Sequence, residues 1–440
     1  MTSPAPNPTG LPAAGAQQGG HDAHTALISE TVLELPEPVA VPATQRHFLP
    51  IPKGIPAHAS CAVVIDLEAI GTNFRALRML AGRSECAGVV KADAYGLGLE
   101  PVLRVLLAEG CRVFFVANID EAWRVRQQAP KAIIYVLNGV YSGTAPAFAE
   151  LKARPVLGSA AEIDEWAAAC RQAGQRWPAA VHVDTGMNRL GLTVRDLQAA
   201  QSRQAFASFD VSLVMSHLAN ADSPGSAMNA RQRQQFDSVR AAFPNVPASL
   251  ANSAGTMLGP AFHYDMVRPG IALYGGRAMK SVQNPMKPVV RLLARIIQVR
   301  EIAAGESVGY GQTFQASRPS RIAIVAAGYA DGLPRGMTNG SVTMALGVPL
   351  SLAESVRPGV GSMAHIQGYP VPIVGRVSMD LIAVDTTDMP ASKLVRGDFA
   401  EIMGSATTVD DIAALSETIG YEVLTRLSRR AHRVYLGKSE

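Results

Sequence analysis

Side chains that can do chemistry stand directly after several short apolar runs of the chain. They are Lys91, Asp184, Arg189, His217, Asn252, Ser253 and Arg268. The amine of Lys91, which ends the run "CAGVVK", could bond covalently to a carbonyl compound. The hydroxyl of Ser253 and the backbone at Gly270 could hold a phosphate. Because no Walker motif accompanies them, we expect the phosphate to belong to a tightly held cofactor.

These residues can act together only if the fold gathers the ends of the apolar runs. Between amphipathic helical stretches, strands are expected near residues 87–90, 112–116, 132–136, 155–157, 179–183, 211–216, 248–251 and 265–268. Eight strands alternating with helices predict a parallel (β/α)8 barrel, an α/β fold whose active site lies at the carboxyl ends of the strands. A doubly wound sheet alternates in the same way, but no G-x-G-x-x-G motif follows the first strand.

The chain divides into three parts by composition. Residues 1–55 are rich in Pro, Gly, Ala and Gln and predict a disordered tail without the charged start or apolar core of a secretory signal. Residues 56–285 carry the alternating pattern of the barrel. Residues 286–440 consist mostly of strand-like runs, such as "VVRLLARIIQVREI", separated by Gly/Pro turns. We therefore expect a second, mostly β domain there.

The composition excludes several functional classes. The 440 residues are 48% apolar and 17% charged, with a net charge of +4, which is typical of a soluble globular protein. No basic stripe with interleaved aromatic residues indicates a nucleic-acid partner. No apolar run reaches the roughly 18 residues of a membrane span. The four cysteines form no C-x-x-C pair, so we expect reduced thiols in a cytoplasmic protein and no metal centre.

One cofactor matches the residues at the strand ends. Pyridoxal 5′-phosphate requires a lysine for its covalent link, donors around its phosphate and a partner for its ring nitrogen. Lys91 and Ser253 meet the first two requirements, and Arg268 and His217 are candidates for the third. The sequence therefore predicts a pyridoxal-phosphate enzyme with its site on the barrel rim.

A series of longer motifs resembles the alanine racemases, the fold-type III family of pyridoxal-phosphate enzymes. The motifs are "VVKADAYGLG", "DTGMNRLG", "MSHLANAD", "ANSAG", "MVRPGIALYG", "SVGYGQTF", "AAGYADGLPR", "GRVSMD" and "IGYEVLTRLSRR". They stand in the family's order and span the chain from about residue 60 to the C-terminus. The N-terminal tail falls outside the resemblance.

The resemblance implies a role for each matching residue. Lys91 would carry the cofactor and act as one catalytic base, and Tyr310 would act as the other. Arg189 and the main chain of Met379 would bind the substrate carboxylate. Arg268 would face the ring nitrogen. The implied cofactor-binding residues are Lys91, Tyr95, His217, Asn252, Ser253, Arg268, Gly270, Ile271 and Tyr421.

The resemblance also implies an assembly and an activity. In this family Tyr310 and Met379 reach the site from the neighbouring subunit, so a homodimer with shared active sites is expected. The implied activity is the interconversion of L- and D-alanine, which supplies D-alanine for peptidoglycan or degrades it. To act as a base near neutral pH, Tyr310 needs a nearby positive charge, for which Arg189 and His217 are the candidates.

One position departs from the family pattern. Many members have a lysine two residues before the Asp of "DTGM", modified to a carbamate that orients the neighbouring arginine. His182 stands there in this chain, so no carbamate is expected. Either a bound anion, a water molecule or an acidic side chain would then orient Arg189, or Arg189 would be less constrained.

Three alternatives compete with an alanine racemase. A broader amino-acid racemase would accept serine or larger side chains, but Tyr310, Tyr329 and Tyr421 are expected to crowd the substrate. The absence of a signal peptide also disfavours a periplasmic racemase of broad specificity. An amino-acid decarboxylase is disfavoured by the motifs "SVGYGQTF" and "GRVSMD". A non-catalytic pyridoxal-phosphate-binding protein is disfavoured by the β domain, because such proteins resemble the barrel alone.

Overall fold

The computed structural model describes residues 49–280, 282–337 and 362–437. Nearly all of the tail predicted for residues 1–55 lies outside the described residues. Among the described residues, no helix combines the length and the apolar character that a membrane crossing requires.

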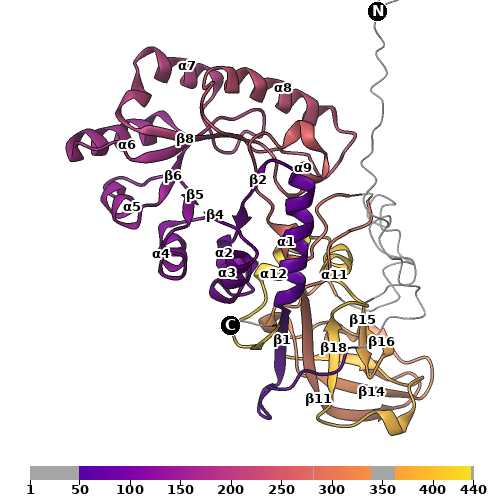
Figure 1. Cartoon of the computed structure of the whole chain (residues 1–440). Coiled ribbons are helices and arrows are strands. Elements are labelled where there is room, and N and C mark those ends of the chain that lie inside the picture. The colour runs from indigo at the N-terminus through magenta and orange to yellow at the C-terminus, as the bar shows by residue number, and fades with distance from the viewer. Residues whose placement is uncertain (1–48, 281, 338–361, 438–440) are drawn as a thin grey trace, which may run out of the picture. The chain divides into compact units, whose positions relative to one another are not determined.

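The first architectural unit is a parallel barrel (Figure 1). Its main sheet contains seven parallel strands in the order β3-β4-β5-β6-β7-β8-β9. They are β3 (Gly88–Val89), β4 (Val113–Val116), β5 (Ile133–Val136), β6 (Arg154–Leu157), β7 (Pro178–His182), β8 (Asp210–Met215) and β9 (Ala248–Ser249). The short strand β2 (Glu85–Cys86) precedes β3 in the same extended segment and pairs in parallel with β10 (Met266–Val267).

Backbone hydrogen bonds between β9 and β10 complete the ring. The N–H of Asp265 donates to the carbonyl of Ala248 over 3.0 Å, and the N–H of Arg268 donates to the carbonyl of Ala251 over 2.9 Å. Because β10 also pairs with β2, the segment 85–89 and the seven strands that follow it form a ring of eight. The predicted (β/α)8 barrel is therefore confirmed, and each observed strand begins and ends within two residues of its predicted bounds.

Helices alternate with these strands. They are α1 (Leu67–Ala81), α2 (Lys91–Tyr95), α3 (Leu99–Ala108), α4 (Ile119–Gln128), α5 (Ala145–Leu151), α6 (Ala160–Ala173), α7 (Val194–Ser202), α8 (Ala227–Ala241) and α9 (Ser253–Met257). Side-chain caps begin two of them: Asp66 accepts the N–H of Ala69, and Ser159 accepts the N–H of Glu162. Strand β4, "VFFV", is wholly buried, as expected where helices cover one face of a strand and the barrel interior fills the other.

The second unit is an antiparallel β barrel. The strands are β11 (Val290–Ile302), β14 (Ser320–Val325), β15 (Met363–Ile366), β16 (Tyr369–Val374), β17 (Ile382–Asp385) and β18 (Phe399–Met403). They follow the order β14-β17-β16-β15-β18-β11, and β14 pairs again with β11 to close the ring. Two small strands, β12 (Ser307–Val308) and β13 (Phe314–Gln315), form a separate hairpin around Tyr310. Helices α11 (Val409–Leu415) and α12 (Gly420–Thr425) follow, and the side chain of Thr408 caps α11.

Two further strands extend this sheet along the first half of β11. Strand β1 (Cys61–Asp66) precedes the parallel barrel in the chain but pairs antiparallel with β11. The last strand, β19 (His432–Leu436), pairs in parallel with β1. Figure 1 shows β1, in indigo, beside β11. The second sheet thus draws strands from both sides of the predicted boundary at residue 286, and that boundary stays a prediction.

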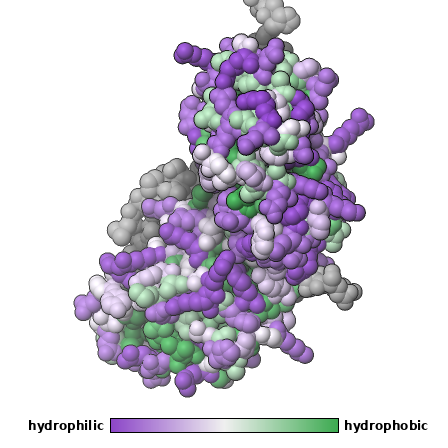
Figure 2. All heavy atoms as spheres, turned by 90° about the vertical axis from the view of Figure 1, so that its left-hand side faces the viewer, coloured by the Kyte–Doolittle hydropathy of each residue, from purple (hydrophilic) through white to green (hydrophobic). Residues whose placement is uncertain are grey.

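The face of the molecule in Figure 2 is mainly hydrophilic. Figure 2 shows hydrophilic side chains over most of the face that it displays, with smaller hydrophobic areas between them. The largest fully buried side chains lie in the parallel barrel and its helices, among them Trp166, Tyr135 and Phe114. The polar residues predicted at the strand ends lie on this packed scaffold.

Candidate active site

The residues predicted from the strand ends share one rim of the parallel barrel. Lys91 follows β3, His182 ends β7, His217 follows β8, Ser253 follows β9 and Arg268 follows β10. The carboxyl ends of parallel barrel strands lie on the same side. They lie close together, since Nη2 of Arg268 is 3.5 Å from Nδ1 of His217, and the charges of His182 and Lys91 also influence the pKa of His217.

Lys91 begins a backbone turn of unusual conformation. The φ angles of the next four residues, Ala92 to Tyr95, are 54°, 57°, 53° and 56°. A left-handed helical conformation costs about 1–2 kcal/mol per residue for ordinary amino acids and is normally adopted by single residues, not by runs. The surrounding structure must therefore hold this segment, and such strain is common at functional sites. We call residues 91–98 the lysine turn.

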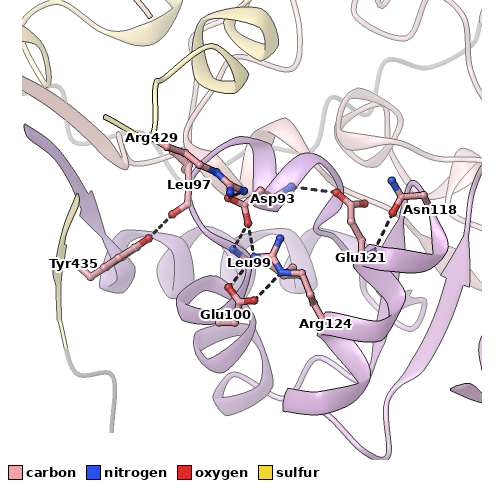
Figure 3. Close-up of polar contacts among 9 residues, drawn as sticks. All are labelled: Asp93, Leu97, Leu99, Glu100, Asn118, Glu121, Arg124, Arg429 and Tyr435. Carbon is pink, nitrogen blue, oxygen red and sulfur yellow. Dashed lines mark hydrogen bonds and ion pairs between the residues drawn. The ribbon is translucent and has the colours of Figure 1, made fainter. Parts of the chain in front are cut away.

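On the barrel side, Asp93 is the centre of the contacts that hold the lysine turn (Figure 3). Its N–H donates to Oε1 of Glu121 over 3.2 Å. Its Oδ1 accepts the N–H of Leu99 over 3.1 Å and Nη2 of Arg124 over 2.6 Å. Arg124 is fixed in turn by Glu100, over 2.7 and 2.8 Å. Asp93 is thus tied to both α3 and α4, the two helices that flank the turn.

The surroundings of Lys91 favour a reactive amine. Burial lowers its pKa, the positive charge of Arg189 lowers it further, and Glu121 opposes both effects. A lower pKa leaves more of the amine unprotonated near neutral pH, which is the form that attacks a carbonyl carbon. The structure therefore fits Lys91 to a covalent cofactor link.

A second group of predicted residues meets beside the lysine turn. Oγ of Ser253 accepts the N–H of Gly270 over 2.8 Å. A Cβ atom at Gly270 would collide with the hydroxyl of Tyr95, so glycine is needed for this close approach. The rings of Tyr95 and Tyr421 lie 5.9 Å apart. Hydroxyl and backbone N–H groups of this kind suit a phosphate, and Asn252 shapes the site by capping α9 through the N–H of Gly255.

Arg268 is buried among neutral acceptors. Its side chain is 4% exposed, and it donates to Oγ of Ser249 and, over 2.6 Å, to the carbonyl of Ser216. Burial lowers its pKa to about 9, so the guanidinium remains charged at neutral pH. None of the ion pairs of the described residues includes Arg268. A ring nitrogen that accepts a hydrogen bond would suit such a group.

Arg189 lies on a loop that Asp184 holds in shape. The carboxylate of Asp184 accepts the N–H groups of Gly186, Met187 and Asn188 over 2.9, 2.8 and 3.0 Å. Arg189 is close enough to lower the pKa values of several rim groups. The site is consequently rich in positive charge and suited to anionic ligands.

Both rim histidines are neutral near pH 7. Burial lowers the pKa of His182 to about 4, Arg268 and Arg189 add to the effect, and Asp184 opposes it. Burial and the neighbouring Arg268 also lower the pKa of His217 well below its ordinary value. Of the two groups considered as a source of positive charge for Tyr310, only Arg189 is therefore charged.

His182 should make stability depend on pH. Because the folded state holds it neutral, the unfolded chain binds more protons between about pH 6.5 and pH 4, and the free energy of unfolding should fall on acidification through this window. We expect His182→Gln to lose less stability than the wild type between pH 7 and pH 5, as measured by urea unfolding. The exposed His58 offers a control, since His58→Gln should follow the wild type. Equal losses in His182→Gln and the wild type would contradict the assignment.

The structure does not bring Tyr310 and Met379 to this rim. Their side chains are 72% and 54% exposed in the β domain. None of the hydrogen bonds or ion pairs found for the described residues joins them to Lys91. The segment of Met379 is held by backbone hydrogen bonds, since the carbonyl of Met379 accepts the N–H of Ala330 over 2.9 Å.

Sequence reasoning missed the residues that hold the segment of Met379. Asp331 is 2% exposed, and its carboxylate accepts Nε and Nη2 of Arg430 over 2.7 and 2.9 Å. The same Nη2 donates over 2.7 Å to Asp380, the residue after Met379. The quoted motifs contain all these residues, but spacing alone does not show which of them pair.

Family models match the chain in two consecutive parts. The model described as "Alanine racemase, N-terminal domain" matches residues 65–278, and "Alanine racemase, C-terminal domain" matches residues 289–435. An alanine racemase of Methylobacterium sp. (strain 4-46) is 46% identical over 374 residues, which are 85% of this chain and 97% of that protein. The biosynthetic and catabolic alanine racemases of Agrobacterium fabrum (strain C58) are 44% and 43% identical over 86% of this chain.

Solved structures agree with these matches. The alanine racemase of Bartonella henselae with covalently bound pyridoxal phosphate superposes with a TM-score of 0.78 at 36% identity, covering 86% of this chain and all of that chain. The biosynthetic enzyme of Pseudomonas aeruginosa superposes with a TM-score of 0.74 at 32% identity and the same coverage. Because both domain models match in order and the relatives are covered almost completely, this chain belongs to the alanine racemase family.

Proposed function

We propose that this protein interconverts L- and D-alanine with pyridoxal 5′-phosphate as its cofactor. The observation that carries the proposal is the position of Lys91, whose amine has a lowered pKa on the same rim as the buried Arg268. Membership of the family and the cofactor named for the Bartonella henselae structure support it. Both a biosynthetic and a catabolic enzyme occur among the relatives, so either direction of use is compatible with the fold.

The rim residues divide into groups that suit different parts of the cofactor. Lys91 would hold it covalently, and Arg268 would face its ring nitrogen. Its phosphate would lie against the hydroxyls of Tyr95, Ser253 and Tyr421 and the N–H groups of Gly270 and Ile271, with His217 and Asn252 shaping the site. When bound, pyridoxal phosphate supplies an electron sink for the α-carbon of an amino acid.

Racemisation needs a proton to leave one face of the α-carbon and to arrive on the other. Two bases on opposite faces of the α-carbon achieve this, and Lys91 would be one of these bases. Tyr310 of the neighbouring subunit would be the second base. The main chain of Met379 from that subunit would bind the substrate carboxylate together with Arg189. The exposure of Tyr310 and Met379 supports such a homodimer, because neither is covered within the subunit.

The location of the protein in the cell is part of the proposal. All four cysteines are free and buried. Burial raises the pKa of Cys61 to about 12 and that of Cys170 in the same direction, so the thiols are unreactive. Free buried thiols are typical of proteins in a reducing compartment, and we place this one in the cytoplasm.

The choice of arginine at the ring nitrogen should suppress a side reaction. A charged guanidinium does not protonate that nitrogen, which weakens the electron sink and disfavours transamination. We expect Arg268→Glu to raise the number of pyruvate molecules formed per racemisation turnover at least several-fold, measured by coupled pyruvate detection. Arg268→Lys, which keeps a positive charge, is the matched control. An unchanged pyruvate yield in Arg268→Glu would contradict this role.

The deciding experiment is a product analysis of the purified holoenzyme. The protein is incubated with L-alanine, L-serine and L-lysine in turn, and D-products are scored by chiral chromatography together with the absorbance of bound cofactor. D-alanine as the main product, lost with the colour in Lys91→Ala, would support the proposal. Comparable D-serine or D-lysine would instead favour a broad-range racemase, for which His182 in place of the family's lysine is the motivating observation. A yellow protein without any D-product would contradict both readings.

A further inference from the structure

The lysine turn is enclosed on a second side by the C-terminal segment, residues 420–436. We propose that this segment is a positioning element for Lys91: it holds the left-handed turn, and with it the cofactor link, from outside the barrel. The proposal relies on the proposed function only for the identity of the cofactor. The contact between the two segments stands on the structure alone.

The two glycines of the lysine turn mark where the C-terminal segment approaches. Gly96 has a φ of 83°, and a Cβ atom there would lie 2.6 Å from the carbonyl oxygen of Leu424 and 3.2 Å from Cα of Thr425. Gly98 has a φ of 99°, and a Cβ atom there would overlap the hydroxyl of Tyr435. Each glycine is therefore required twice, for its backbone angle and for the room that it leaves to the C-terminal segment.

Polar contacts join the same two segments (Figure 3). The hydroxyl of Tyr435 donates to the carbonyl of Leu97 over 3.0 Å. Nη2 of Arg429 lies 3.5 Å from Oδ2 of Asp93. The hydroxyl of Tyr435 therefore has two effects on the turn. It leaves no room for a side chain at Gly98, and it binds the carbonyl of Leu97.

An aromatic contact completes the enclosure. The ring centroid of Tyr421 lies 5.9 Å from that of Tyr95, which lies 4.8 Å from that of Tyr274 on its other side. Contacts from residues 420–436 therefore reach positions 93, 95, 96, 97 and 98 of the lysine turn.

The two supports of the turn meet at Asp93, and the C-terminal support also reaches the glycines at the end of the turn. The barrel holds Asp93 through Glu121 and Arg124, at the start of the turn. The C-terminal segment adds Arg429 at Asp93 and contacts residues 95–98 at the end of the turn. An unsupported run of left-handed residues would relax toward ordinary backbone angles and move Lys91. The eight-stranded ring does not include this segment, so the barrel itself should survive its loss.

Gly96→Ala tests the proposal against a matched control. Gly143 has a similar φ of 78°, and no atom lies within 4 Å of a Cβ atom built there. Gly143→Ala therefore measures the effect of placing alanine at a positive φ angle, without a clash against the C-terminal segment. We expect Gly96→Ala to speed hydrogen exchange of a peptide spanning residues 91–99 and to weaken retention of pyridoxal phosphate about tenfold, a loss comparable to one buried hydrogen bond. Gly143→Ala should change neither quantity.

A second pair of variants keeps the test independent of misfolding. Gly98→Ala should show the same two defects, and adding Tyr435→Phe should reverse them in part, because the phenylalanine ring leaves room for the new Cβ atom. Gly259, with a φ of 107° and no neighbouring atom, provides the backbone control through Gly259→Ala. Tyr435→Phe alone, which loses only the bond to Leu97, should loosen the cofactor by a few-fold.

Each outcome decides the question. Unchanged exchange and retention in Gly96→Ala and Tyr435→Phe would overturn the proposal, and so would equal defects in the Gly143 and Gly259 controls. Faster exchange at residues 91–99 with weaker retention, reversed in the double variant, would support it. Exchange is measured in cofactor-depleted protein as well. If the wild type neither retained pyridoxal phosphate nor racemised alanine, the proposed function would fail while the exchange data would still test the contact.

Discussion

Replacing Tyr310 with phenylalanine should slow the racemisation of alanine by about 10²–10⁴-fold in both directions, which is the usual contribution of one general acid–base group. On the proposed mechanism, the change removes the hydroxyl from one face of the substrate and leaves Lys91 on the other. In deuterated water, one enantiomer should therefore still exchange its α-proton while its conversion to the other is suppressed. Chiral chromatography with mass detection measures both rates. Tyr369→Phe, an exposed tyrosine in β16, is the control and should behave as the wild type.

Mixing two inactive variants tests whether the sites are shared between subunits. On the proposed mechanism, Lys91→Ala lacks one base and Tyr310→Phe lacks the other. If each site takes its lysine from one subunit and its tyrosine from the other, a mixed dimer regains one complete site. Random reassortment should then recover roughly a quarter of the wild-type activity. No recovery, in a mixture shown to exchange subunits, would contradict the shared site.

Replacing Arg291 with methionine should lower the free energy of unfolding by about 3–5 kcal/mol, because it leaves a buried carboxylate without its partner. Nε of Arg291 in β11 lies 2.6 Å from Oε2 of Glu401 in β18, and the side chains are only 9% and 5% exposed. Burial raises the pKa of Glu401, and Arg291 opposes this rise. In the variant the carboxyl should therefore favour protonation, so the loss of stability should be greatest at neutral pH and shrink on acidification.

Urea unfolding at two pH values measures this effect. The double change Arg291→Met with Glu401→Met should recover most of the stability, because a well-packed apolar pair can replace a buried ion pair. Arg203 pairs with Asp164 at the surface, where the side chains are 46% and 54% exposed. Arg203→Met should consequently cost less than about 1 kcal/mol. Equal losses from Arg291→Met and Arg203→Met would show that burial does not decide the effect.

The alternation of apolar runs was sufficient to predict the barrel. Each run is short, nearly continuous and bounded by turn residues, and the polar residues at the strand ends lie on the rim because the topology places them there. The partner of the run at 61–66 was not predictable. Its apolar residues indicate a strand, but nothing local shows that it pairs with β11 and β19 and lies outside the barrel.

The conformation of the lysine turn was equally hidden. Four consecutive positive φ angles fall on residues that include two alanines and a tyrosine, which ordinarily disfavour them. The angles are imposed by tertiary contacts, such as those of Asp93 with Arg124. Contacts of this kind join residues far apart in the chain, and a single sequence contains no signal of them. The glycines at 96 and 98 were visible, but the segment that they accommodate was not.

The pairing of β1 with β19 limits how this enzyme can be cut and recombined. The first described strand, β1, and the last one, β19, are hydrogen-bonded neighbours, and β1 lies between β19 and β11 in the sheet. A gene fusion or fragment joined at residue 286 would carry β1 away with the barrel and leave an open strand edge on the remaining sheet, a template for aggregation. Exchange of the β domain between relatives should succeed only when the donor also contributes residues 61–66. The smallest exchangeable unit therefore consists of two segments that are separated in the gene.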